Sequence, residues 1–318
     1  MFDMITRVGR MVLSDRVAGA LRDGEPVVAL ESTIITHGLP QPENVQAALE
    51  FERTVAEAGA VPATIAVVRG EVHVGLDPGE LERLAGADAP LKLSARDLPV
   101  AVARRATGGT TVAATALLAA QVGIRVFATG GIGGVHRGAG ASFDESADLG
   151  ILSRCRITVV SGGVKSILDI GATLERLETL GVTVLVFGTD RFPAFWLTDS
   201  GYTVDFSVAS AREIADVMRA ADELGLPGGM LVANPLPEAA QLEPDLHDRL
   251  LAEALEAAES ASIRGKEITP FLLDYIHQHT ERTSVAVNLE IVRGNCRLGA
   301  EIAKAWAAPA SRDSQPAR

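Results

Sequence analysis

The sequence predicts an α/β protein built as a three-layer α/β/α sandwich with a central mixed, largely parallel sheet. Two patterns point to this class. Short apolar runs alternate along the 318 residues with longer segments in which apolar residues recur at helical spacing. The apolar runs are continuous, which is typical of strands that helices cover on both faces. Hydrophobic residues make up 47% of the chain but aromatic residues only 4%, which suits closely packed layers of small side chains.

The strands and helices are predicted from where these patterns begin and end. Each predicted strand is a run rich in small and β-branched apolar residues, and each predicted helix has an apolar face. Gly123 and Gly181 end two of the helices directly before a strand, as glycine commonly does. In chain order, the predicted elements are a helix at about 1–22, strand 26–33, helix 44–59, strand 62–68, helix 111–123, strand 124–130, strand 156–160, helix 167–181, strand 182–189, helix 210–225, strand 228–235, helix 244–262 and helix 284–307.

The two ends of the chain differ in character. Charged residues interrupt the apolar ones near the N-terminus, so this segment is predicted to be an amphipathic helix and not a signal peptide. No long Gly-, Ser- or Pro-rich linker divides the chain, so residues 1–307 are predicted to form one domain. The segment 308–318 consists largely of Ala, Ser, Arg and Pro and is predicted to be a flexible tail.

The overall composition limits the classes of partner. A formal net charge of −12 disfavours nucleic acids and anionic membranes, because such polyanions repel an acidic protein. No run approaches the ~18 apolar residues that a membrane span requires. Cys155 and Cys296 are too few for a disulfide framework and are predicted to be reduced thiols. We therefore expect a cytoplasmic protein whose partner is a small molecule.

Two ionisable residues follow predicted strands, at the sheet edge where α/β proteins bind their ligands. Glu31 could be a general acid or a solvated turn residue. Lys165 stands between a strand and a helix, and could clamp a phosphate, form an imine as a nucleophile, or lie at the surface. Lys92 and Asp144 occupy comparable positions, so one cleft could collect all four side chains.

Two glycine-rich stretches suggest binding sites. Gly108 and Gly109 are predicted to open a helix whose first turn carries Val112, and free amides at a helix start attract anions. Six glycines fall within residues 130–140, but their spacing does not fit a dinucleotide-binding loop. Asp144 and Asp148 follow them, and two carboxylates at this spacing suit a hard divalent cation that keeps most of its water. The alternative for the second stretch is a solvated acidic loop.

Long strings of the sequence resemble the pseudouridine-5′-phosphate glycosidase family, which is similar to the indigoidine-synthase A-like proteins. The strings are ALESTIITHGLPQPEN, GAVPATIAVVRGEVHVGL, KLSARDL, GGTTVAAT, FATGGIGGVHRGA, SFDESADL, GGVKSILDI, LETLGV and TDRFPAFW, and they run in order from about residue 25 to 305. The resemblance implies an α/β/α homotrimer that uses a divalent ion, usually Mn²⁺. It also implies a reversible reaction in which pseudouridine 5′-phosphate and water give uracil and ribose 5-phosphate.

The resemblance further implies roles for individual residues. The lysine of GGVKSILDI, Lys165, would be the covalent nucleophile, and the glutamate of ALESTI, Glu31, would be the proton donor. The aspartate of SFDESADL, Asp144, would hold the metal. Substrate contacts would fall on Lys92, the backbone at Val112, Ser146, Ala147, Asp148, Thr129, His136 and, near the base, Asn288.

The chain departs from the family pattern at Glu145, Gly294 and Trp196, none of which is the nucleophile, acid or metal position. Two other functions stay open. A Schiff-base lyase or aldolase acting on another sugar phosphate would share Lys165 and the phosphate site but would need no uracil pocket. A non-catalytic protein would bind a sugar phosphate without forming a covalent adduct.

Overall fold

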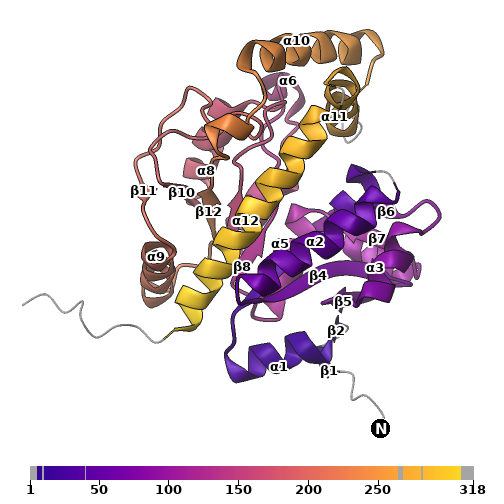
Figure 1. The fold of residues 1–318 in the computed structure, drawn as a ribbon, viewed down its shortest axis with the longest axis vertical. Helices are drawn as coiled ribbons and strands as arrows, with labels where there is room; N and C mark the ends of the chain where they lie inside the picture. Colours follow the sequence, from indigo (N-terminus) through magenta and orange to yellow (C-terminus); the bar gives the residue numbers. More distant parts are fainter. Residues whose placement is uncertain (1–5, 9–10, 40, 264–267, 281, 309–318) are drawn as a thin grey trace, which may run out of the picture.

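The computed structural model describes residues 6–8, 11–39, 41–263, 268–280 and 282–308, and it confirms the predicted class (Figure 1). The strands are β1 (Thr6–Val8), β2 (Met11–Leu13), β3 (Val27–Leu30), β4 (Val61–Val68), β5 (Glu71–Val74), β6 (Leu91–Leu93), β7 (Gly108–Thr110), β8 (Val126–Ala128), β9 (Thr158–Ser161), β10 (Thr183–Phe187), β11 (Ser207–Val208) and β12 (Met230–Ala233). The helices are α1 (Asp15–Asp23), α2 (Glu43–Glu57), α3 (Pro78–Ala85), α4 (Leu98–Ala103), α5 (Val112–Gln121), α6 (Ala139–Ser142), α7 (Ala147–Leu152), α8 (Ile170–Thr179), α9 (Ala211–Glu223), α10 (Pro244–Ser260), α11 (Ile268–His279) and α12 (Thr283–Ala307), with short helical turns η1 (Ile34–Gly38), η2 (Ala95–Asp97) and η3 (Glu238–Ala240).

The sheet is parallel through its centre. Strands β4, β3, β8, β9, β12, β10 and β11 lie side by side in that order, and each neighbouring pair is parallel. Strands β5 and β7 pair with β4 in the antiparallel sense, which makes the sheet mixed. Parallel strands end at the same edge, so the residues that follow β3, β8 and β9 are brought together there.

Helices cover both faces of this sheet because its strands are apolar on both faces. On β3, Val28 and Leu30 pack in the same cluster as buried residues of α2, α9 and α12. The alternate residues Val27 and Ala29 pack with buried residues of α1 and α5. A strand buried on both sides needs a continuous apolar run, which is the pattern that predicted three layers.

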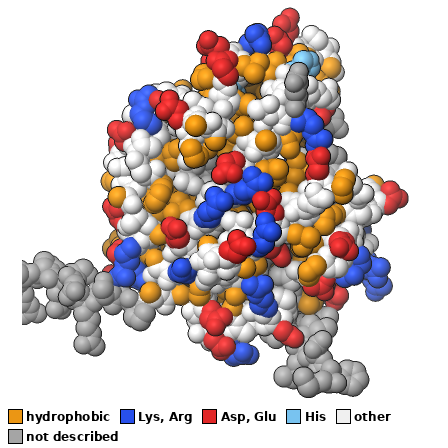
Figure 2. Space-filling view, viewed as in Figure 1, with side chains coloured by type: hydrophobic (Ala, Val, Ile, Leu, Met, Phe, Trp, Pro, Cys, Tyr) orange, Lys and Arg blue, Asp and Glu red, His pale blue; other side chains and the backbone are white. Residues whose placement is uncertain are grey.

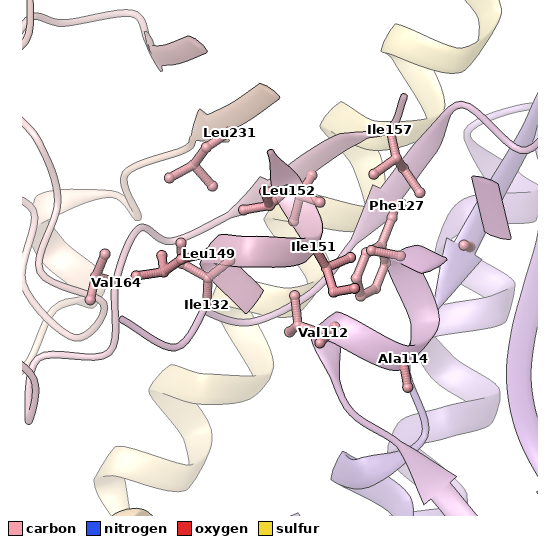
Figure 3. Close-up of a cluster of buried hydrophobic side chains, with 14 of the residues drawn as sticks. Val112, Ala114, Phe127, Ile132, Leu149, Ile151, Leu152, Ile157, Val164 and Leu231 are labelled. Atoms are coloured by element: carbon pink, nitrogen blue, oxygen red, sulfur yellow. The ribbon is translucent and has the colours of Figure 1, made fainter. Parts of the chain in front are cut away.

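A dense part of the core lies where α5 and α7 meet β8, β9 and β12. Figure 3 shows buried side chains from these elements and their adjoining loops packed together, and the labelled ones are Val112, Ala114, Phe127, Ile132, Leu149, Ile151, Leu152, Ile157, Val164 and Leu231. Burying one such large apolar side chain stabilises the fold by about 1.5–3 kcal/mol. This packing holds the starts of α5 and α7 and the loops after β8 and β9 in fixed relation.

The prediction of one helix over about residues 1–22 is wrong. The helix α1 begins at Asp15, and the Ser14 side chain caps it by accepting a hydrogen bond from Val17 N. Before it, β2 pairs with β5 in the parallel sense, and Met11 and Leu13 are buried there. Helical periodicity alone could not reveal this pairing, because the partner strand lies about 60 residues further along the chain.

The helix predicted to open at Gly108 begins later, because Gly108–Thr110 form strand β7 between β4 and β6. A Cβ at Gly108 would lie 2.4 Å from the Leu91 carbonyl oxygen, and one at Gly109 would lie 2.4 Å from Thr36 Oγ1. These close approaches explain the glycines better than a helix start does. Helix α5 starts at Val112, and the Thr111 hydroxyl caps it.

Helix α12 was predicted over 284–307 and is observed over nearly that range, crossing the face drawn in Figure 1 beside α2. Figure 2 shows side chains of both charges gathered over the middle of this face. Between α12 and α2, Arg293 contacts Glu50 of α2 at 2.8 Å, and it also contacts Glu290 of α12 at 3.3 Å. The predicted tail lies, apart from Ala308, outside the described residues, and the predicted boundaries of a single domain stay a prediction. Within the described part of the chain, no helix is both long and apolar enough to cross a bilayer.

Candidate active site

Glu31 lies directly after β3, at the edge of the sheet where parallel strands end. The hydroxyl of Thr33 donates a hydrogen bond to its Oε2, and the hydroxyl of Thr129 donates one to its Oε1. Thr129 follows the neighbouring strand β8, and its own carbonyl oxygen accepts a hydrogen bond of 2.7 Å from Asn295 Nδ2. Both carboxylate oxygens of Glu31 are therefore held in place, which is what a group that transfers a proton at a defined atom requires.

Lys165 lies in the loop between β9 and α8, as its sequence context predicted. Its backbone N–H donates to the Ile132 carbonyl at 3.2 Å, and a β-bridge joins Ile132 to Val164. The loop after β9 is thus tied to the loop after β8. The Lys165 side chain is half-buried and lines the same cavities as Glu31.

Lys92, on strand β6, completes a group of three charged side chains. Desolvation lowers the pKa of Lys92 from its ordinary value, and the positive charge of Lys165 lowers it further, while Glu31 acts in the opposite direction. These interactions indicate that Lys92 lies within electrostatic reach of both Lys165 and Glu31. Desolvation also lowers the pKa of His37, and so does the charge of Lys92.

Two adjoining cavities share Glu31, Thr33, Lys92, Lys165 and Thr269. We call the first, of about 210 Å³, the apolar cavity. Its further walls carry mostly apolar side chains, together with the polar side chains of His37, Asp274, His277 and Asn288. The apolar ones are Ile34, Leu39, Phe195, Pro270, Leu273, Leu289 and Val292. The reacting part of a ligand would lie at the shared residues, with an apolar group on this side.

The second, which we call the polar cavity, has a volume of about 480 Å³. Of the predicted substrate residues, it is lined by Lys92, Val112, His136, Ser146, Ala147 and Asp148. Val112 is the first residue of α5, and the partial positive charge at the N-terminus of a helix attracts anions. Arg96 and Arg154 line the same cavity and add positive charge. The cavity therefore suits an anionic group such as a phosphate.

Asp148 has a structural role that its sequence position did not reveal. It is buried, and its Oδ1 accepts a hydrogen bond from Ala113 N at 2.8 Å while its Oδ2 accepts one from Gly133 N at 2.7 Å. The carboxylate therefore joins the start of α5 to the loop after β8. Ser146 caps α7, and its Oγ accepts a hydrogen bond from Asp148 N at 3.2 Å.

Asp144 also lines the polar cavity, next to Glu145. The Glu145 carboxylate forms an ion pair with Arg176 at 2.9 Å, and the Asp148 carboxylate accepts hydrogen bonds from two backbone N–H groups. In the described residues there is no group of three or more His, Cys, Asp or Glu side chains arranged to hold a metal. The donor set around Asp144 thus fits only an ion that takes most of its ligands from water or from a bound substrate.

Asn288, on α12, is the predicted residue that lies in the apolar cavity and not in the polar one. Its Oδ1 accepts a hydrogen bond from the indole Nε1 of Trp196. The neighbouring Phe195 forms a wall, and a Cβ at Gly131 would lie only 2.7 Å from its ring. The close contact explains why glycine occupies this part of the loop after β8.

Sequence patterns missed several of these residues. Thr33 lies two residues after Glu31, and the sequence alone could have predicted their hydrogen bond, since a hydroxyl near a carboxylate in the chain is a common donor to it. Thr269 lies on α11, whose position over the cleft depends on contacts with α10 and α12 and leaves no local signal. The hydroxyl of Thr129 donates to Glu31, a contact that the sequence did not reveal, and the predicted contact of Thr129 with substrate stays a prediction.

An α/β protein that gathers a lysine, a carboxylic acid and an anion-binding cavity at the carboxyl edge of a parallel sheet has the architecture of an enzyme acting on a phosphorylated metabolite. The sequence profile described as indigoidine synthase A like protein matches residues 16–305. The chain therefore belongs to the indigoidine synthase A-like family.

Relatives in this family are close in sequence and in structure. A pseudouridine-5′-phosphate glycosidase of Salinispora tropica is 59% identical over 92% of this chain and 90% of its own length. One of Frankia alni is 56% identical over 96% of this chain and 85% of its own length. The crystal structure of a prealnumycin C-glycosynthase in complex with ribulose 5-phosphate matches with a TM-score of 0.88 and 34% identity, covering 95% of this chain and 98% of that one. An indigoidine synthase A-like protein from Thermotoga maritima matches with a TM-score of 0.84 and 34% identity, covering 95% and 99% of the two chains.

Proposed function

We propose that this protein cleaves the C1′–C5 bond of pseudouridine 5′-phosphate reversibly, with water, to give uracil and ribose 5-phosphate. The observation that carries the proposal is the meeting of Glu31, Lys92 and Lys165 where an apolar and a polar cavity join. The names of the relatives support this reaction. The ribulose 5-phosphate bound by the structural neighbour supports a sugar phosphate as ligand.

The two cavities suit the two ends of this substrate. The phosphate would lie in the polar cavity, against Lys92, the start of α5 and the turn at Ser146 and Ala147, and Arg154 would add positive charge. The base would lie in the apolar cavity, between Phe195 and Asn288. Binding energy from the phosphate would then orient the ribose, so that its C1′ lies beside Glu31 and Lys165.

The chemistry requires both residues because the bond to be broken joins two carbon atoms. Protonation of a base nitrogen, which suffices for an ordinary nucleoside, gives no leaving group here. In our mechanism the Glu31 carboxyl gives its proton to the ribose ring oxygen, and the C1′–O4′ bond breaks. The neutral amine of Lys165 then bonds to C1′ and gives up a proton, which restores the proton that Glu31 lost.

Cleavage follows from the open-chain adduct. Glu31, which regained its proton in the previous step, gives that proton to C5 of the uracil ring, and the lone pair of the Lys165 nitrogen forms a C=N bond to C1′ as the C1′–C5 bond breaks. Uracil leaves, and a protonated imine of ribose 5-phosphate stays on Lys165. Water adds to this imine and releases ribose 5-phosphate, the neutral amine and one proton, which returns to Glu31, so that one water is consumed for each bond cleaved.

We also propose that Asp144 holds a divalent ion, Mn²⁺, with the rest of its ligands from water and substrate. Such an ion would supply fixed positive charge beside the phosphate. Around it, Glu145 is already paired with Arg176, so Asp144 is the carboxylate of this loop that is left to bind it. The protein's own contribution is the turn that carries Asp144, held by the hydrogen bond from His136 N to the Asp144 carbonyl at 3.0 Å.

Two further parts of the proposal are a homotrimer and a cytoplasmic location. The family resemblance supports the trimer, which sedimentation velocity would distinguish from a monomer of 33.3 kDa. The two buried free thiols, Cys155 and Cys296, support a reducing compartment, and cell fractionation would test it. The partner remains a small molecule and neither nucleic acid nor membrane.

The purified protein is expected to release uracil from pseudouridine 5′-phosphate, and to lose most of this activity when EDTA removes divalent ions. Ultraviolet absorbance follows the base, and added Mn²⁺ should restore the rate. Uracil release separates this function from its rivals, because an aldolase-type lyase and a non-catalytic binding protein would release none. A protein that binds ribose 5-phosphate but leaves the nucleotide intact would refute the proposal.

Replacing Lys92 with glutamine is expected to raise KM by about 10- to 100-fold with a smaller effect on kcat, because a hydrogen bond to a charged group contributes about 1.5–3 kcal/mol. The sign of the pH effect follows from its lowered pKa. Lys92 carries its charge below that pKa and loses it as pH rises, so KM of the native protein should increase at a pH below 10.5. Lys92→Arg should keep a low KM there, since a guanidinium stays charged. Identical KM profiles for the native and Lys92→Arg proteins would show that another group binds the phosphate.

A further inference from the structure

We propose that Trp196 is a positioning residue that makes the apolar cavity select a base carrying a carbonyl over one carrying an amino group at the same position. Trp196 would act by fixing which end of the Asn288 amide faces the ligand. The inference rests on the proposed function, because it concerns the base of the same substrate.

The orientation of the Asn288 amide follows from the chemistry of its partner. The indole N–H of Trp196 can donate a hydrogen bond but cannot accept one. The atom of Asn288 that it contacts must therefore be the oxygen, Oδ1. Within the described residues, the amide nitrogen of Asn288 has no protein hydrogen-bond partner, and the side chain lines the apolar cavity. The amide thus offers N–H donors to whatever lies there.

The indole is itself rigidly held. Trp196 is fully buried, and the rings of His247 and His277 pack against it edge to face, with centroids 6.1 and 5.9 Å away. Its carbonyl oxygen accepts a hydrogen bond from Leu242 N at 3.0 Å. His277 Nδ1 lies 2.6 Å from Ser284 Oγ, which anchors that ring to the start of α12. Rotation of the Asn288 amide by about 180° would break its hydrogen bond to the Trp196 indole, and the packing around the indole keeps Trp196 from following.

A fixed N–H donor discriminates between two kinds of pyrimidine. A ring carbonyl accepts its hydrogen bond. An amino group at the same place is also a donor, so neither it nor the Asn288 N–H would have an acceptor. Sites built to hydrogen-bond one group reject the mismatched analogue by roughly 100-fold or more in kcat/KM. The uracil ring has two carbonyls, one next to the C5 that bears the ribose and one across the ring, so either one could meet Asn288.

Three C-nucleotides test the inference: pseudouridine 5′-phosphate, its 4-amino analogue pseudocytidine 5′-phosphate, and its 2-amino analogue pseudoisocytidine 5′-phosphate. The native protein should reject at least one amino analogue by about 100-fold in kcat/KM. Trp196→Phe frees the amide to present either end and should reduce that rejection to under about 10-fold. Ratios measured on one sample do not depend on how much of the variant is folded, so a loss of stability does not disturb the comparison.

Two further variants sharpen the test. Asn288→Asp keeps the acceptor for Trp196 but replaces the N–H donors by a second oxygen, so it should shift the preference toward the amino analogue. Trp306→Phe is the matched control, because Trp306 stacks on Arg125 away from both cavities and should leave the ratios unchanged. Unchanged ratios in Trp196→Phe and Asn288→Asp, or a native protein that accepts both analogues freely, would overturn the inference while uracil release still stands. A native protein that releases no uracil would overturn the proposed function as well.

Discussion

Replacing Lys165 with alanine is expected to abolish uracil release, with kcat lower by on the order of 10⁴-fold or more, because the variant lacks the amine that forms the bond to C1′. The fold should persist, since the Lys165 side chain is half-buried and its loop is held by backbone contacts to Ile132. The measurements are steady-state turnover together with thermal unfolding of the variant. Lys165→Arg should be equally inactive, which separates loss of the nucleophile from loss of the charge.

Trapping identifies the covalent step itself. Borohydride added to the native protein with ribose 5-phosphate should reduce the imine and fix one sugar phosphate to the peptide that contains Lys165. Lys304→Ala is a matched control, because Lys304 is exposed near the far end of α12 and should affect neither turnover nor trapping. This mechanism would be excluded if the reduced sugar phosphate were found on the peptide containing Lys92 in place of Lys165. Turnover by Lys165→Ala at the native rate would also exclude it.

Glu31→Gln is expected to lower kcat by about 10²- to 10⁴-fold, the usual loss when a positioned acid is removed, with a much smaller change in KM. Glutamine keeps the shape of the side chain and can still accept the hydrogen bond from Thr129, but it has no proton to give to the ring oxygen. Pre-steady-state measurement of uracil release would report this step directly.

The control for this variant lies near the other end of the same strand. Glu25 is exposed just before the opposite end of β3, so Glu25→Gln makes the same chemical change away from the cleft and should leave kcat unaltered. If Glu31→Gln kept kcat within about tenfold of the native value, the proton would have to come from another group. His37 would then be the next residue to replace, because it lines the same cavity.

The corrections to the predicted fold arise where a partner lies far along the chain. The N-terminal segment has an amphipathic pattern, yet β2 pairs with β5, and the helix α1 begins after Ser14. Likewise Gly108 and Gly109 look like the start of an anion-binding helix, but close contacts with Leu91 and Thr36 make them a strand. Local patterns carry no information about such contacts, since they depend on which strands become neighbours.

By itself the sequence determined the layered class, because short continuous apolar runs that alternate with amphipathic helices are typical of a sheet covered on both faces. It also placed Glu31 and Lys165 after strands, as the structure confirms, whereas Lys92, which it also made a candidate, lies within β6 and not after it. Tertiary structure decided what those residues do together. It brought Thr129 onto one oxygen of Glu31, turned Asp148 toward backbone amides, and set Trp196 against Asn288. The physical reason is that hydrogen bonds between side chains act over a few ångströms, and only folding brings residues so distant in the chain to that range.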